Sequence, residues 1–175
     1  MIDNGTSTLD MAASSIGGDL TLTSGHATGI TDSGTITVGG DLTATTDAAS
    51  GVITLDTLAV DGNMTLTTNG SGNATVINDT GVAFAAVNVG GDLSATATTG
   101  NISDSGTLSV SGASSFTTSE NNATITLDTA TNALTGAVTL SSTGTNAHVI
   151  IDNGSTALSA QGSICLLYTS AAADE

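Results

Sequence analysis

The strongest constraint on this chain is an internal repeat with a period near 24 residues. A short segment that begins with Ile and contains an Asp occurs six times, and its aspartates are Asp32, Asp56, Asp79, Asp104, Asp128 and Asp152. The steps between them are 24, 23, 25, 24 and 24 residues. Self-similarity at a fixed period of this size is typical of repeat architectures.

Two further segments recur with the first. The segment Gly-Gly-Asp-Leu-Thr-Leu-Thr at residues 17–23 returns, with changes, at 39–45, 61–67, 90–96 and 111–117, and its second residue is Gly in each copy. A third segment has apolar residues at its second and fourth positions, at 35–38, 57–60, 86–89, 107–110, 137–140 and 157–160. Alternation of apolar and hydroxyl residues predicts strands with one buried face.

Three short strands per repeat, separated by corners of Gly, Asp, Asn and Ser, predict one coil of a parallel β-solenoid. A single coil cannot bury its inner face, but stacked coils pair every strand with its equivalent about 4.8 Å along. We therefore expect an all-β fold of about six to seven coils of about 24 residues over 1–164. A β-sandwich also contains many short strands, but it does not require the same residue at the same place in each copy.

The stacking predicts columns of like residues inside the solenoid. One column is expected to hold Leu20, Leu42, Met64 and Leu93, and another to hold Ile36, Leu58, Val87, Leu108, Val138 and Leu158. The invariant Gly, as at Gly40, indicates a corner whose backbone has positive φ, which side chains strain.

The charge of the chain excludes several functions. It contains no Lys or Arg and 16 Asp and Glu residues, for a formal net charge of -16. Binding of nucleic acid and attraction to anionic membranes both need cations, so neither partner is expected. Hydrophobic residues make up 38% and charged residues only 9%, which argues against disorder. No apolar run approaches the roughly 18 residues of a membrane span, so direct membrane insertion is not expected.

The Asp column is the one candidate metal site. Carboxylates at residues 32, 56, 79, 104, 128 and 152 would suit Ca²⁺ along one corner, because the chain has no other counterion for them. The alternative, which we favour, is that each Asp caps its own turn. Asp19, Asp41 and Asp92, with Asn63 between them, form a second partial column that we expect to be ordinary corner chemistry.

Catalysis is not predicted, and no cofactor is expected apart from the Ca²⁺ just weighed. His26 and His148 are 122 residues apart, about five coils, and are expected to be solvated. Hydroxyl residues at 21, 43, 65, 94 and 115, and at 23, 45, 67, 96 and 117, are expected to form a flat two-column array on one sheet face. Such arrays resemble ice-binding solenoids, although Thr is also simply a good polar residue for a strand face.

The repeat pattern stops at Ile164. Residues Cys165 to Glu175 match no repeat and resemble the translated end of a transposase adapter used in sequencing libraries. We therefore expect 165–175 to be a non-native tail, with a natural terminal strand as the alternative. Ile2-Asp3-Asn4-Gly5 echoes Ile151-Asp152-Asn153-Gly154, so we expect the chain to be a fragment of a longer protein.

Taken together, repeats such as Gly-Gly-Asp-Leu-Thr and Ile-Thr-Asp-Ser-Gly-Thr-Ile-Thr-Val resemble the repeat region of filamentous haemagglutinin-like bacterial adhesins. The resemblance implies a right-handed parallel β-helix in a large exported protein, secreted or held at the bacterial cell surface by a two-partner or autotransporter route. The expected function is a structural stalk whose partners are neighbouring coils of the same chain. The competing function is a surface-binding module for ice, Ca²⁺ or glycans, and the host ligand stays open.

Overall fold

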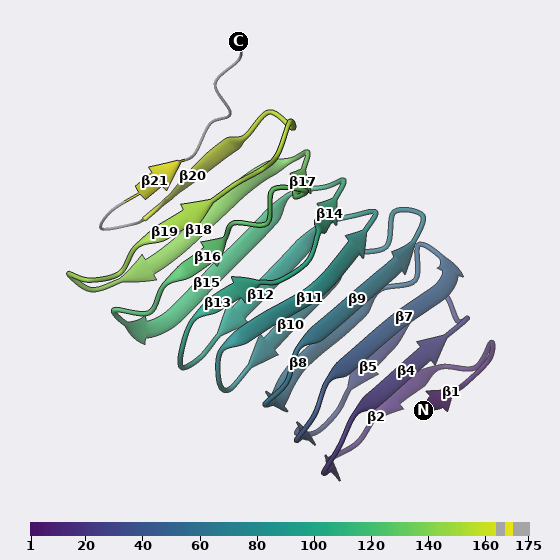
Figure 1. The fold of residues 1–175 in the computed structure, drawn as a ribbon. Helices are drawn as coiled ribbons and strands as arrows, with labels where there is room; N and C mark the ends of the chain where they lie inside the picture. Colours follow the sequence, from purple (N-terminus) through teal and green to yellow (C-terminus); the bar gives the residue numbers. More distant parts are fainter. Residues whose placement is uncertain (164–166, 170–175) are drawn as a thin grey trace.

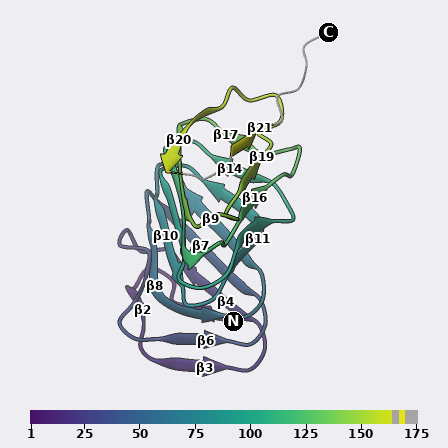
Figure 2. The same cartoon turned by 90° about the vertical axis from the view of Figure 1, so that its left-hand side faces the viewer.

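The computed structural model describes residues 1–163 and the strand at 167–169. Its strands form two long sheets that face each other across a narrow interior and run the length of the molecule (Figures 1 and 2). Every printed strand pair is parallel, and the described residues contain no helix. The predicted β-solenoid is confirmed, with about seven turns.

The first sheet has a continuous path of nine strands and two side strands. The path runs through β1 (Ile2–Asp3), β4 (Leu20–Ser24), β7 (Leu42–Ala49), β9 (Met64–Asn69), β11 (Val82–Val89), β13 (Ile102–Asp104), β16 (Ile125–Leu127), β19 (Val149–Ile151) and β21 (Leu167–Thr169). The side strands are β14 (Leu108–Val110) and β17 (Ala133–Leu134). Of the predicted tail, only 167–169 is described, paired with β19; the rest lies outside the described residues.

The second sheet completes each coil. Its path runs through β2 (Leu9–Met11), β5 (Ile30–Asp32), β8 (Ile53–Val60), β10 (Ala74–Asn78), β12 (Leu93–Ala97), β15 (Ser114–Asn121), β18 (Ala137–Thr143) and β20 (Ser159–Ser163). Strands β3 (Ser14–Ile16) and β6 (Ile36–Val38) pair beside this path and join it through the second half of β8. Each coil therefore crosses between the sheets at two corners.

The prediction of three strands per coil is correct for some coils only. Where Asp-Ser-Gly follows a strand, the chain bends and a separate strand begins, as between β5 and β6 and between β13 and β14. In the middle coils, Leu55-Asp56-Thr57 and Phe84-Ala85-Ala86 carry no such Gly. There, β8 and β11 run on as single strands of 8 residues each.

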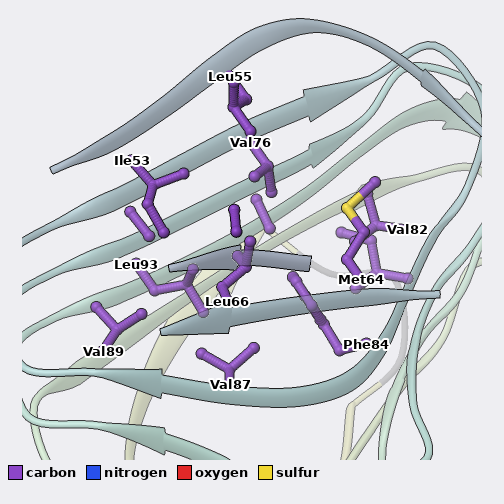
Figure 3. Packing of buried hydrophobic residues seen from close by; sticks show 14 of the residues in the cluster. Ile53, Leu55, Met64, Leu66, Val76, Val82, Phe84, Val87, Val89 and Leu93 are labelled. Carbon is purple, nitrogen blue, oxygen red and sulfur yellow. The ribbon is translucent and has the colours of Figure 1, made fainter. Parts of the chain in front are cut away.

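The interior is a stack of aliphatic side chains, seen between the sheets in Figure 3. Residues from opposite sheets meet there, including Ile53 and Val76 from one and Met64 and Phe84 from the other. Both phenylalanines of the chain, Phe84 and Phe116, are fully buried. A core assembled from one inward residue in two along each strand explains why so few large side chains are needed.

The first predicted column is wrong at its fourth member. Leu20, Leu42 and Met64 are neighbours in the first sheet, but the next place is taken by Phe84. Leu93 lies in the second sheet, between Ala74 and Ser114. The repeat copies therefore do not follow one another in one column, because the spacing between copies is not always one coil.

The second predicted column also divides between the sheets. Ile36 and Leu58 are neighbours in the second sheet, whereas Val87 and Leu108 are neighbours in the first. Val138 belongs to neither pair, since it stacks on Ser114 in β15. Segment 137–140 is thus a sixth copy of the Gly-Gly-Asp-Leu segment, with Gly136 at the invariant position and β17 as the third strand of its coil.

A buried hydroxyl follows the outward pair in several copies, and its environment differs between the two sheets. In the first sheet Thr46 donates to the carbonyl of Gly51 (3.0 Å), and Thr68 donates to that of Gly72 (2.9 Å). At the equivalent place in the second sheet, the buried hydroxyls of Thr118 and Ser142 make no hydrogen bond. An unpartnered buried hydroxyl destabilises a fold, whereas a satisfied one does not.

We therefore expect opposite effects from the same substitution at two equivalent positions. Thr118→Val removes an unpartnered hydroxyl and should leave stability unchanged or raise it by up to about 1 kcal/mol. Thr46→Val leaves the Gly51 carbonyl without its donor and should cost about 1–3 kcal/mol. Urea unfolding followed by circular dichroism measures both, and an equal loss in the two variants would contradict this assignment.

Candidate functional site

Side-chain oxygens continue the hydrogen bonding between coils at the corners, where the strands end. At the first corner, which leads into the first sheet, Asp19 Oδ1 accepts the backbone N–H of Asp41 (3.0 Å), and Asp41 Oδ1 accepts that of Asn63 (2.7 Å). At the second corner, which leads into the second sheet, Asn73 Oδ1 accepts from Asp92 and Asp92 Oδ1 accepts from Ala113, both at 2.8 Å. We call these two runs the corner ladders.

Each ladder depends on the Gly that precedes its next member. A Cβ at Gly40 would lie 2.2 Å from Asp19 Oδ1 and 2.8 Å from the backbone carbon of Gly18. Gly62, Gly91 and Gly112 lie equally close to the ladder oxygen of the coil before. The expectation of positive φ at Gly40 is wrong, because its φ is not in the left-handed region. The Gly is needed for space, since the Asp side chain reaches past its Cα to the next N–H.

A matched pair of glycines tests this packing. Gly40→Ala should cost about 1–3 kcal/mol, as expected for a side chain forced into a filled space. Gly18→Ala occupies the same place one coil earlier, where a Cβ would meet nothing within 4 Å, and should cost far less. Thermal unfolding of both variants decides the matter, and similar losses would show that backbone conformation rather than contact selects Gly.

The six aspartates of the predicted Ca²⁺ column do not lie along one corner. Asp32 and Asp56 belong to strands of the second sheet and Asp79 follows another, whereas Asp104, Asp128 and Asp152 lie in or directly after strands of the first. Among the described residues, no three His, Cys, Asp or Glu side chains form a group able to hold a metal ion. The predicted single column is thus wrong in geometry, because the copies change sheets midway.

The hydrogen bonds of these aspartates differ from the own-turn capping that we favoured. Asp32 accepts the N–H groups of Asp56 and Thr57 from the following coil, at 3.0 and 2.9 Å. Asp104 accepts the N–H of Asp128 at 3.0 Å. Asp152 does cap its own turn, through the N–H of Gly154 at 2.8 Å. Most of this chemistry therefore joins coils.

Asp104 is the one carboxyl whose titration is perturbed. Burial raises its pKa above the ordinary value of 3.8, although hydrogen bonds from the Asn132 side chain and the Asp128 N–H act in the opposite direction. A carboxyl whose pKa is higher in the folded state binds protons more readily there than in the unfolded state. Between the two pKa values, its contribution to stability therefore falls as the pH rises.

The substitution Asp104→Asn should accordingly change the pH dependence of stability. The free energy of unfolding of the variant, relative to the unmodified chain, should be most favourable near neutral pH and should decline toward about pH 4. Urea unfolding across this range measures the difference. Asp10→Asn controls for the loss of one negative charge, and a pH-independent difference for Asp104→Asn would contradict the assignment.

The outward hydroxyls form two arrays rather than one. In the first sheet Thr21 and Thr23 pair with Thr43 and Thr45, which pair in turn with Thr65 and Thr67. In the second sheet the corresponding rungs are Ser94 and Thr96, Ser115 and Thr117, and Thr139 and Ser141. All twelve side chains are partly exposed. The prediction of a single face is wrong, since the arrays lie on opposite sheets.

The histidines lie apart from these arrays. His26 Nδ1 contacts the hydroxyl of Thr28 at 2.7 Å within its own loop, and His148 Nδ1 contacts the carbonyl of Asn146 at 3.3 Å. A shallow depression of about 370 Å³ runs beside the second array, between Asp92 and Ala113 on one side and Ser94 and Ser115 on the other. Its lining is polar, and its depth is that of a surface groove.

Sequence reasoning missed the buried asparagines. Asn78 is fully buried, and its amide binds both the N–H and the carbonyl of Val60 at 2.8 and 2.9 Å, as a backbone neighbour would. Asn153 does the same for Leu134. Their signal is weak, because each stands where an apolar residue of a strand is expected. Asn73 was more accessible, since it directly precedes an alternating strand.

The comparisons with known proteins identify a family. Residues 2–69 and 71–141 match the family described as repeats of unknown function (DUF5649), so the chain belongs to that family. Neither a curated protein nor a solved structure matches the chain. The described residues include no helix long and apolar enough to cross a membrane.

Proposed function

We propose that this chain is a stalk segment of a large exported bacterial surface protein, similar to the repeat region of filamentous haemagglutinin-like adhesins. The observation that carries the proposal is the unbroken parallel stacking of coils along one axis (Figure 1). About seven coils at roughly 4.8 Å each give a rod segment near 34 Å long, and further repeats would lengthen it in proportion.

Interlocked corners suit a load-bearing rod. Each coil is joined to the next by sheet hydrogen bonds on both sides and by ladder bonds at the corners. Because a coil contacts only its neighbours, stability is a sum of local terms and length can vary without redesign of the core. A net charge of -16 with no Lys or Arg favours solubility and suppresses lateral association of such rods.

Antibodies raised against the purified chain test the proposal. They should label intact cells of the source organism without permeabilisation, and immunogold should place the segment outside the outer surface. An excess of soluble chain should leave adhesion of those cells unchanged, because a stalk does not contact the ligand. Labelling only after permeabilisation would overturn the surface assignment, and competition with adhesion would overturn the stalk assignment.

The second candidate is binding to a flat polar surface through the hydroxyl arrays. The observation that favours it is that all twelve array positions carry Ser or Thr in strict register. An ordered lattice of water, as in ice, would match a rigid array of hydroxyls better than a disordered partner would. Thermal hysteresis of the purified chain, compared with a Thr43→Lys and Ser115→Lys variant, separates this candidate from the stalk.

A further inference from the structure

We infer that the family unit, about 72 residues long, is a structural module of three and a half coils, so that successive modules face opposite sides of the solenoid. The inference does not depend on whether the segment is a stalk. It concerns which surface each module presents to a partner.

The two family matches define equivalent residues. Each contains three copies of the Gly-x-apolar segment, beginning at Leu20, Leu42 and Met64 in the first and at Leu93, Ser114 and Val138 in the second. Equivalent residues are 72 to 74 apart. The hydroxyl rungs and the outward or inward order of each strand agree between the two sets.

The register shows how many coils this distance spans. From Leu20, three steps through the first sheet reach Leu42, Met64 and Phe84. The chain then crosses to the second sheet before the next copy begins at Leu93, which pairs with Ala74. Copies within a module are 22 residues apart, as from Gly40 to Gly62, whereas Gly62 and Gly91 are 29 apart. The longer step adds half a coil.

The corner chemistry follows the same exchange. Asp19, Asp41 and Asn63 form the ladder of the first module at the first corner, and Asn73 and Asp92 form that of the second module at the opposite corner. The buried hydroxyls move with them, from Thr46 in the first sheet to Thr118 in the second. Three independent features thus turn by half a coil together.

The consequence is a two-faced ribbon. The first module presents its hydroxyl array on the first sheet, and the second module presents the equivalent array on the second sheet. The outward positions of both arrays are uncharged, and several of the acids lie at the corners. A partner that recognises a flat neutral hydroxyl surface therefore meets one such surface on each side of this chain, and further modules would continue the alternation.

Pairs of pyrene labels distinguish this arrangement from one in which all copies stack on one face. In a Cys165→Ser background, labelled Thr75→Cys with Ser94→Cys should give strong excimer emission, because the structure pairs these residues. Labelled Thr65→Cys with Ser94→Cys should give little, because these residues lie in different sheets. One-faced stacking predicts the reverse, with Ser94 following Thr65.

Thr43→Cys with Thr65→Cys, neighbours within the first sheet, is the positive control. The excimer-to-monomer ratio of T75C/S94C should be close to that of the control and several-fold above that of T65C/S94C. A strong excimer from T65C/S94C, or none from T75C/S94C beside a strong control, would overturn the inference. If any of these variants fails to fold, T96C/T117C against T67C/T96C makes the same comparison at the second hydroxyl of each rung.

Discussion

The solenoid depends on one arrangement: an Asp or Asn oxygen that accepts the backbone N–H of the next coil, past a Gly that leaves it room. Sheet hydrogen bonds alone hold the strands in register, but they stop where the strands stop. Asp19, Asp41 and Asp92 carry the register round the corners. Because a slip of one residue in a strand moves its apolar set to the solvent face, a fixed corner also keeps Leu42 and Leu93 inside.

This arrangement explains an otherwise costly composition. A chain with 16 acids and no Lys or Arg cannot neutralise its carboxylates with its own cations. It uses several of them as acceptors of backbone N–H groups, which favours the charged form. Asp104 is the exception, since desolvation outweighs its hydrogen bonds. Charge placed at corners also leaves much of the sheet faces to hydroxyls, so the rod has neutral faces with acidic corners.

The exchange of sheets between the two modules gives the middle of the chain its character. Strands β8 and β11 are long and unbroken where the first module ends and the second begins. Asn78 fills a strand position there with its amide bound to Val60. A change of half a coil alters which residues face each other, and these features accommodate it without interrupting either sheet.

The sequence by itself determined the class of fold, because a 24-residue period and alternating strands leave parallel stacking as the way to bury one face of every strand. It also determined that Gly40 and its equivalents are required and that hydroxyls face outward in pairs. It did not determine which copies touch. Copies of like sequence look like neighbours, yet Leu93 stacks on Ala74 rather than Met64. Only the tertiary structure decided this, since register depends on the residues spent in each corner, and a step of 29 in place of 22 moves a copy to the opposite sheet.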